Sequence, residues 1–296
     1  MNILVFGYSG QVAQELLRLS EKSTFSFIFL ERQDADLLFP DRCAQIIFDH
    51  KPSAVINAAA WTAVDAAETS ESDALVINGK SPGAMARTCA ELSIPFVHIS
   101  SDYVFDGSGN TPWQPYDIVK PLGAYGRSKL LGEQLVQDSG AQAVIMRTSW
   151  VFSSHGSNFV KTMLRLGKER DILNVVGDQV GGPTSASAIA GAVLTIVEAL
   201  LKGSSGGIFH FSGAPAASWA EFASVIMDQA DIPCKINPIL SADYPTKASR
   251  PLNSRLDGYT LFEEFNISQP DWIKGLKCVL NELNELNELK EQSHGT

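Results

Sequence analysis

Two hydrophobic patterns alternate through the first half of the chain. Short runs of Val, Ile, Leu and Phe without polar alternation are typical of strands buried on both faces of a parallel sheet. Longer segments with apolar residues at helical spacing separate these runs. This alternation predicts an α/β fold with a Rossmann-like, doubly wound parallel sheet. The predicted strands cover residues 2–6, 26–30, 53–60, 95–101 and 143–150, and the predicted helices cover residues 10–22, 40–51, 73–93 and 126–139.

The second half of the chain is less regular. Ser218 and Glu221 have the spacing of a capping box at the start of a helix. Residues 244–257 contain Pro and Arg without a regular period, which indicates a loop suited to gripping a ligand. The pattern predicts strands at 172–176 and 206–213 and helices at 158–169, 185–203, 218–231 and 272–292.

The C-terminal helix carries a threefold Asn-Glu-Leu repeat. Leu286 and Leu289 recur every three residues and therefore drift away from the apolar face of the helix. The pattern favours a helix that docks on the body and frays into solvent, and a coiled-coil partner is the alternative. The apolar face is formed by Trp272, Leu276, Val279, Leu280 and Leu283.

Composition and charge exclude several classes of protein. The 296 residues are 45% hydrophobic and 19% charged, which suits a large buried core. The net charge of -10 argues against broad contact with nucleic acid or an anionic membrane, because both require clustered Lys and Arg. No apolar stretch reaches the roughly 18 residues of a membrane span, and the N-terminal strand lacks the basic flank of a signal peptide. We therefore expect a cytoplasmic protein.

A glycine-bearing turn follows the first predicted strand and opens the first helix. Gly7 permits a tight turn, Gly10 lets a pyrophosphate approach the backbone, and Ala13 is small enough for the helix to pack on the sheet. The N-terminus of the helix, at Gln11 and Val12, supplies free N–H groups and a partial positive charge. This turn predicts a dinucleotide site.

The dinucleotide site suggests a division of the chain. Residues 1–150 are predicted to form a dinucleotide-binding domain. Residues 172–202 are predicted to add a strand and a helix to that domain. Residues 151–171 and 203–296 are predicted to form a smaller C-terminal substrate-binding lobe.

The end of the second predicted strand bears on the choice of cofactor. A carboxylate such as Glu31 accepts from the 2′-hydroxyl of NAD, whereas Arg32 favours the 2′-phosphate of NADP. Asp36 is a candidate for the adenine edge, and an ordinary surface carboxylate is the alternative. These residues favour NADPH slightly over NADH and leave the use of both open.

Tyr125 and Lys129 lie four residues apart on a predicted helix and hence on one face of it. The ordinary pKa of a tyrosine, about 10, is too high for ready proton exchange at neutral pH. A nearby ammonium would lower this pKa by stabilising the phenolate. Because the spacing alone is common, other motifs must support a catalytic role.

Several sequence blocks together resemble the extended short-chain dehydrogenase/reductase family. They are the glycine turn, the NAAA of residues 57–60, the SSDYVF of residues 100–105 and the Y-x-x-x-K pair. Longer blocks such as HISSDYVFDG, PLGAYGRSKLLGE and SRPLNSRLD are similar to those of dTDP-4-dehydrorhamnose reductases, over nearly the whole chain. The resemblance implies hydride transfer from NAD(P)H to C4 of a 4-keto-6-deoxyhexose bound as a nucleotide sugar. The product would be dTDP-L-rhamnose, formed in the last step of its biosynthesis.

The resemblance also implies roles for residues. Tyr125 would donate the proton, Lys129 would contact the phenol and the nicotinamide ribose, and Ser101 would donate a hydrogen bond to the developing alkoxide. Core packing is the alternative for Trp150. The implied cofactor contacts are Gly7, Gly10, Gln11, Val12, Arg32, Asp36, Leu37, Ala58, Ala59, Ala60, Trp61, Thr62, Tyr125 and Lys129. The implied substrate contacts are Val64, Ser101, Asp102, Tyr103, Tyr125, Trp150, Arg250 and Arg255, the two arginines holding the diphosphate unless they form only surface ion pairs.

Two further features concern Asn78 and a possible metal site. Asn78 is a candidate to bond the sheet backbone near the site, and a helix-surface asparagine is the alternative. Some family members bind a divalent cation through glutamates, two of which match Glu15 and Glu282, but the third position is Ser187 here. The missing ligand argues against Mg²⁺ and against a metal-bridged dimer, while a homodimer of another kind stays open. Glu15 and Glu282 are therefore expected to be exposed helix carboxylates.

Two other functions are compatible with this fold. A non-catalytic regulatory subunit, such as the β subunit of methionine adenosyltransferase, has no need of Ser101, Tyr125 and Lys129 together. A nucleotide-sugar 4-epimerase would keep the chemistry but would hold NAD tightly and recycle it. Net oxidation of added NADPH by the keto sugar distinguishes the three functions.

Overall fold

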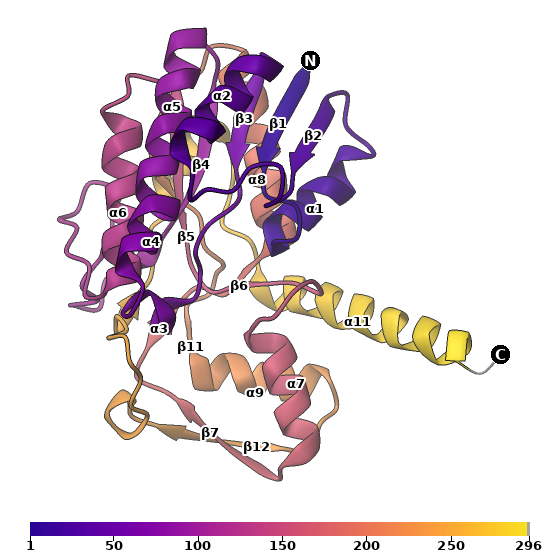
Figure 1. Cartoon of the computed structure of the whole chain (residues 1–296). Helices are drawn as coiled ribbons and strands as arrows, with labels where there is room; N and C mark the ends of the chain where they lie inside the picture. The colour runs from indigo at the N-terminus through magenta and orange to yellow at the C-terminus, as the bar shows by residue number, and fades with distance from the viewer. Residues whose placement is uncertain (295–296) are drawn as a thin grey trace.

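Six parallel strands form the central sheet, in the order β10-β5-β4-β3-β1-β2 (Figure 1). The computed structural model describes the backbone of residues 1–294 and the side chains of residues 1–286. The chain winds outward in both directions from the boundary between β1 and β3, which confirms the predicted doubly wound fold. The strands are β1 (Asn2–Phe6), β2 (Ser26–Leu30), β3 (Ala54–Asn57), β4 (Phe96–Ser101), β5 (Ala143–Thr148) and β10 (Gly207–His210).

Helices cover both faces of this sheet (Figure 1). Helices α1 (Gln11–Ser20) and α8 (Ala186–Leu201) pack on one face, and α2 (Pro40–His50), α5 (Ser81–Leu92) and α6 (Ala124–Gln137) pack on the other. Along β1, Ile3 and Val5 lie in the first core and Leu4 and Phe6 in the second, because successive strand residues point to opposite faces. Each such buried side chain contributes about 1.5–3 kcal/mol. Burial on both faces explains the uninterrupted apolar runs of these strands.

The lobe below the carboxyl ends of the strands (Figure 1) has a hydrophobic core of its own, the third in the molecule's described part. It is enclosed by α7 (Phe159–Glu169), α9 (Trp219–Gln229), α11 (Trp272–His294) and a ribbon of β7 (Ile172–Val176) and β12 (Lys235–Ile239). The predicted capping box is present: Glu221 N–H donates to Ser218 Oγ, and Ser218 N–H donates to the Glu221 carboxylate. This core and its elements form the smaller lobe.

Short elements connect the two parts and shape the region between them. The segment predicted as one helix at 73–93 consists of two α-helices separated by a π-helical turn, η1, which contains Asn78. The remaining elements are α3 (Val64–Ala67), α4 (Glu71–Leu75), η1 (Val76–Lys80), η2 (Asp102–Val104), β6 (Val151–Phe152), β8 (Val180–Gly181), β9 (Thr184–Ser185), β11 (Ala217–Ser218), η3 (Ser241–Asp243), β13 (Asn253–Ser254) and α10 (Tyr259–Phe265).

The predicted division of the chain needs correction at three places. Strand 172–176 pairs with β12 in the lobe and does not join the six-stranded sheet. Its residues alternate between exposed and buried, as a strand with one solvated face requires, whereas the strands between β2 and β10 are buried on both faces. The sixth strand is instead 207–210, from the segment predicted to lie wholly in the lobe. Helix α10 also packs on the large domain, through Leu261 and Phe265.

The C-terminal helix docks by the predicted face. Trp272, Leu276, Val279 and Leu280 are buried in the lobe core, and Leu283 packs against it. Leu286 is 43% exposed, as its drift around the helix predicts. The side chain of Leu289 lies outside the described residues. The last turns of α11 extend beyond the body of the molecule (Figure 1).

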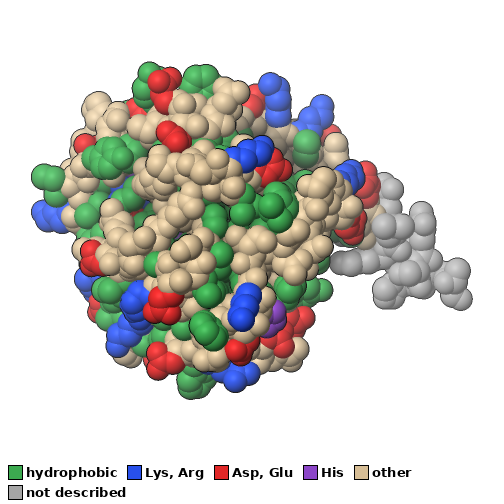
Figure 2. All heavy atoms as spheres, turned by 90° about the horizontal axis from the view of Figure 1, so that it is seen from above, with side chains coloured by type: hydrophobic (Ala, Val, Ile, Leu, Met, Phe, Trp, Pro, Cys, Tyr) green, Lys and Arg blue, Asp and Glu red, His purple; other side chains and the backbone are tan. Residues whose placement is uncertain are grey.

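Positive and negative side chains are mixed on the surface of the face shown in Figure 2. Figure 2 shows one face of the described chain, on which Lys and Arg side chains are interspersed with Asp and Glu and do not gather into a patch. Within the described residues, none of the helices has both the length and the apolar character needed to cross a membrane.

Candidate active site

A cavity of about 700 Å³ opens at the carboxyl edge of the central sheet, between the sheet and the lobe. This edge is where ligands bind in doubly wound folds, at the point where the strand order reverses. It brings together most of the residues that the sequence singles out. Those that line the cavity are Gly7, Gly10, Gln11, Val12, Arg32, Asp36, Leu37, Ala58, Ala59, Ala60, Thr62, Val64, Ser101, Asp102, Tyr103, Tyr125, Lys129 and Trp150.

The glycine turn lies directly against the loop that follows β3. Gly7 has a φ of 114°, which side-chain-bearing residues rarely adopt, and a Cβ there would lie 3.3 Å from the backbone of Ala58 and Ala59. Gly10 caps α1 in an extended conformation and provides no side chain for the cap. The first N–H groups of α1 therefore face the cavity without side-chain competition.

The side chain of Gln11 is held by the protein. Its Oε1 accepts hydrogen bonds from Ser153 Oγ and from Asn158 Nδ2, both at 2.9 Å. Its Nε2 donates to the carbonyl oxygen of Val151 at 3.4 Å. Gln11 can therefore offer a ligand its backbone N–H at the helix N-terminus, while its carboxamide ties the helix to residues 151–158.

Arg32 and Asp36 form one rim of the cavity, beyond the end of β2. Arg32 Nε lies 3.3 Å from Asp36 Oδ2, and the arginine side chain is 78% exposed. Glu31, the residue that would favour NAD, does not line the cavity. The Arg32 guanidinium can therefore turn toward a ligand phosphate, because an exposed ion pair costs little free energy to break.

Tyr125 and Ser101 meet at the inner end of the cavity. Burial raises the pKa of Tyr125 to about 12, while a hydrogen bond with Ser101 acts in the opposite direction. The Tyr125 ring also packs edge to face on Tyr103, with 5.4 Å between the ring centroids. Ser101 Oγ donates to Asp102 Oδ1 at 2.9 Å.

Lys129 follows one turn later on α6. Its Nζ donates to the carbonyl oxygen of Ile99 at 2.7 Å. Burial lowers the pKa of Lys129 to about 8, although Glu133 favours its charged form. The predicted lowering of the Tyr125 pKa by this ammonium is wrong for the structure as it stands, because desolvation of the phenol dominates and the ammonium is directed to Ile99.

Asn78 secures the loop after β3 from within the π-helical turn. Its Oδ1 accepts from Trp61 N–H at 2.8 Å, and its Nδ2 donates to the Trp61 carbonyl and to Ser128 Oγ, both at 3.0 Å. Asn78 is 1% exposed, so it is not a helix-surface residue. It bonds the backbone of the loop and not that of a strand.

Three predicted contacts do not line the cavity. Trp61 turns its indole N–H to the carbonyl of Ala63. Arg250 forms an ion pair with Asp65 at 2.8 Å, beside Val64, which does line the cavity. Arg255 donates to Asn110 O and Asn253 Oδ1. Trp61 is held by a neighbour two residues away, whereas Arg250 and Arg255 bond residues far away in the sequence.

Trp150 lines the cavity and is not simply a core residue. It has a φ of 49°, and its ring stacks on Trp219 with 3.6 Å between the centroids. Trp219, which sequence reasoning missed, also lines the cavity from the first turn of α9. The only signal in the sequence was a tryptophan directly after a helix cap, which is too common to be specific. Gly156, Ser157 and Asn158 also line the cavity and were missed, because small and polar loop residues give no specific signal in the sequence.

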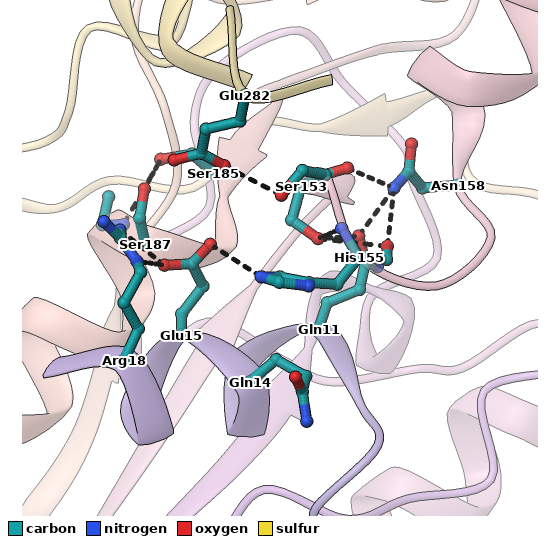
Figure 3. A network of polar contacts seen from close by, with 12 residues as sticks. Gln11, Gln14, Glu15, Arg18, Ser153, His155, Asn158, Ser185, Ser187 and Glu282 are labelled. Atoms are coloured by element: carbon teal, nitrogen blue, oxygen red, sulfur yellow. Dashed lines mark hydrogen bonds and ion pairs between the residues drawn. The ribbon is translucent and has the colours of Figure 1, made fainter. Parts of the chain in front are cut away.

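The residues matching the metal site of some family members do not fit a divalent cation here. Glu15 is 1% exposed, contrary to the expected surface position, and both Arg18 Nε and Arg18 Nη2 donate to its Oε2, at 2.9 and 2.7 Å. Ser187 Oγ donates to Ser185 Oγ. Figure 3 shows the Ser187 side chain between those of Glu15 and Glu282. The positive charge beside Glu15 is an arginine, and no group of three metal-ligating side chains occurs among the described residues.

This fold and this cavity define the class of Rossmann-type enzymes that carry a Tyr–Lys pair beside a dinucleotide turn. Comparison with known proteins narrows the class. The family model for the RmlD substrate binding domain matches residues 1–285, and the chain belongs to this family.

Individual relatives are similar over nearly the whole chain. A dTDP-4-dehydrorhamnose reductase from Aggregatibacter actinomycetemcomitans is 40% identical over 285 residues, which cover 93% of this chain and 97% of the relative. The crystal structure of a dTDP-4-dehydrorhamnose reductase from Clostridium acetobutylicum superposes with a TM-score of 0.91 at 35% identity, covering 96% of this chain and all of the other. A Bacillus anthracis dTDP-4-dehydrorhamnose reductase in complex with NADP has a TM-score of 0.87 at 30% identity, covering 95% and 99%.

Proposed function

We propose that this protein reduces dTDP-4-dehydrorhamnose to dTDP-L-rhamnose with NAD(P)H, in the final step of dTDP-rhamnose biosynthesis. The observation that carries the proposal is that one cavity is lined both by the glycine turn and by Ser101, Tyr125 and Lys129. A non-catalytic regulatory subunit would not need these three side chains beside a dinucleotide turn. The near-complete coverage of relatives named as this reductase supports the choice of substrate.

The proposed chemistry uses the chain's own side chains as acid and anchors. When bound, the reduced nicotinamide supplies the hydride to C4 of the keto sugar. Tyr125, with a pKa of about 12, is protonated at neutral pH and can donate its proton to the sugar oxygen. Ser101 can donate a hydrogen bond to the same oxygen as negative charge develops on it, once its hydroxyl turns away from Asp102 Oδ1. Lys129 retains its charge at neutral pH and can stabilise the phenolate that remains if its Nζ turns from the Ile99 carbonyl toward Tyr125.

We propose NADPH as the preferred cofactor, with NADH also accepted. Arg32 at the rim suits a 2′-phosphate, whereas Glu31 lies outside the cavity lining. The first turn of α1 suits the pyrophosphate, and Ala58, Ala59, Ala60 and Thr62 suit the remainder of the dinucleotide. The B. anthracis relative was solved in complex with NADP.

The nucleotide sugar is proposed to enter beside Val64, Asp102, Tyr103 and Trp150. Arg250 is retained as a candidate for the diphosphate, which would have to displace Asp65 from the guanidinium. Arg255 is the weaker candidate because its partners lie away from the cavity. A cytoplasmic location and a homodimer without a bridging metal complete the proposal.

The test is net oxidation of NADPH, followed by absorbance, on addition of dTDP-4-dehydrorhamnose. We expect stoichiometric oxidation and formation of dTDP-L-rhamnose. A 4-epimerase would convert a nucleotide sugar without net oxidation of NADPH, and a regulatory subunit would show no turnover. Either result would overturn the proposed function.

Tyr125→Phe tests the acid directly. We expect turnover to fall by at least about a hundredfold while NADPH binding is retained, because the ring stays and only the proton donor is lost. Tyr116→Phe is the matched control, since Tyr116 is 83% exposed, and it should leave turnover unchanged. Equal turnover of the two variants would refute the assignment.

A further inference from the structure

Glu15 is a buried carboxylate on the helix that opens the cofactor site. It is 1% exposed and has two basic neighbours. Arg18, on the same helix, donates to Oε2, and His155 Nε2 lies 3.6 Å from Oε1. A buried carboxylate is costly unless it is paired, so these contacts constrain where Arg18 and His155 can lie.

His155 belongs to a loop, residues 153–158, that forms part of the cavity wall. Gly156, Ser157 and Asn158 line the cavity. The same loop bonds the first residue of α1, since Ser153 Oγ and Asn158 Nδ2 both donate to Gln11 Oε1. The loop therefore contacts α1 twice, at Gln11 on the cavity side and at Glu15 one turn further along (Figure 3).

The loop is also attached to the C-terminal helix. Ser154 Oγ donates to Glu282 Oε2 of α11 at 2.8 Å, and Lys161 Nζ donates to the Ser154 carbonyl at 3.2 Å. Glu282 further raises the pKa of Arg18, which places the carboxylates of α1 and α11 in one electrostatic network. This network joins three segments that are far apart in the sequence.

We propose that Glu15 and Glu282 are positioning residues for the dinucleotide, which they serve by holding loop 153–158 against the N-terminus of α1. Glu15 fixes the loop through His155, and Glu282 fixes it through Ser154. Arg18 supplies the positive charge at Glu15, so the arrangement works without a divalent cation. The inference rests on the proposed function in one respect, that the cavity holds a dinucleotide.

The experiment measures NADPH binding by fluorescence titration for Glu15→Gln. We expect the Kd for NADPH to rise about tenfold, because the loop is no longer held and the bound state must order it. The kcat at saturating NADPH and the KM for the nucleotide sugar should stay within about twofold, since Tyr125 and the sugar end are untouched. A purely structural role of Glu15 would lower activity and stability without this split.

Glu169→Gln is the matched control, because Glu169 also pairs with an arginine on its own helix but its side chain is 52% exposed and remote from the cavity wall. Its Kd should equal that of the unchanged protein. Ser154→Ala, which removes only the bond to Glu282, should raise the Kd about threefold and decides the matter if Glu15→Gln fails to fold.

A chelator tests whether the arrangement at Glu15 requires a divalent cation. Treatment with EDTA followed by added Mg²⁺ should leave the Kd for NADPH and the Tm of the unchanged protein the same. Loss of binding on chelation with recovery on adding Mg²⁺ would overturn the metal-free arrangement. Unaltered binding in both Glu15→Gln and Ser154→Ala would overturn the positioning role alone. If the unchanged protein binds no dinucleotide, the proposed function fails and this inference fails with it.

Discussion

Burial sets the protonation of individual residues at the site. The pKa values of Tyr125, Lys129 and Asp102 are all displaced toward the neutral form of the side chain. Each group lies in a wall of the cavity where water is scarce, and desolvation is the largest cause in every case. Burial raises the pKa of Asp102 from 3.8 to about 6, so its protonation affects stability in this pH range.

Asp102→Asn tests this effect. Burial raises the pKa of Asp102 from 3.8 to about 6, so between those values the native state binds more protons than the unfolded state. Stability then falls as pH rises through this window, and the cost persists above it. The variant lacks this cost. The difference in unfolding free energy, variant minus unchanged protein, should therefore be more favourable to the variant at pH 8 than at pH 4, by up to about 2–3 kcal/mol. Urea unfolding at the two pH values measures this, and a difference independent of pH would contradict it.

Glycines allow helix α6 to pack closely against its neighbouring helices. Helix α6 lies against η1 and α5 through glycines contributed by both sides. A Cβ on Gly79 or Gly83 would meet Leu131 or Leu135 at 2.6 Å, and one on Gly132 would overlap the carbonyl oxygen of Asn78. Because Asn78 in turn holds the backbone of Trp61, this contact connects the catalytic helix to the cofactor loop.

Gly132→Ala should therefore destabilise the protein by about 2–3 kcal/mol, through overpacking against backbone that cannot move freely. Gly191→Ala on α8 is the matched control. A Cβ there meets nothing within 4 Å, so the variant should gain about 0.5–1 kcal/mol from improved helix propensity. The unfolding free energies of the two variants measure the contrast, and the same sign for both would show that the contact yields.

A buried ion pair links several elements of the large domain. Arg147 of β5 and Glu133 of α6 are 2% and 1% exposed and lie 2.7 Å apart. Glu133 also accepts from Ser100 on β4, and Arg147 donates to the carbonyl of Pro115. The pair thus links two central strands, the catalytic helix and the segment leading to it.

Arg147→Met should cost about 3–5 kcal/mol of stability, because it leaves Glu133 as an uncompensated buried charge. The double variant Arg147→Met with Glu133→Leu should recover most of that loss. Arg127→Met is the control, since its pair with Glu71 is exposed and should be worth less than about 1 kcal/mol. Denaturant unfolding compares the three, and an Arg147→Met as stable as Arg127→Met would contradict the expectation.

Much of the fold and site followed from local patterns. The apolar runs predicted the first five central strands, the Ser218 and Glu221 spacing predicted a cap, and the face of α11 was correct through Leu283. The π-turn at Asn78 could not be predicted, because it continues the helix and no start or stop signal in the sequence marks it. Nor could the partner of strand 172–176, since its sequence ILNVV identifies a strand but neither a solvated face nor a neighbouring strand.

The sequence by itself determined where strands and helices form and that a glycine turn precedes the first helix, because backbone conformation and side-chain periodicity act over a few residues. It also determined which residues carry acid, cation and hydroxyl groups. Only the tertiary structure decided that Glu15 is buried, that Arg250 turns to Asp65, and that Trp219 joins the cavity wall. These outcomes depend on groups far apart in the chain, whose desolvation and pairing are set when the elements pack.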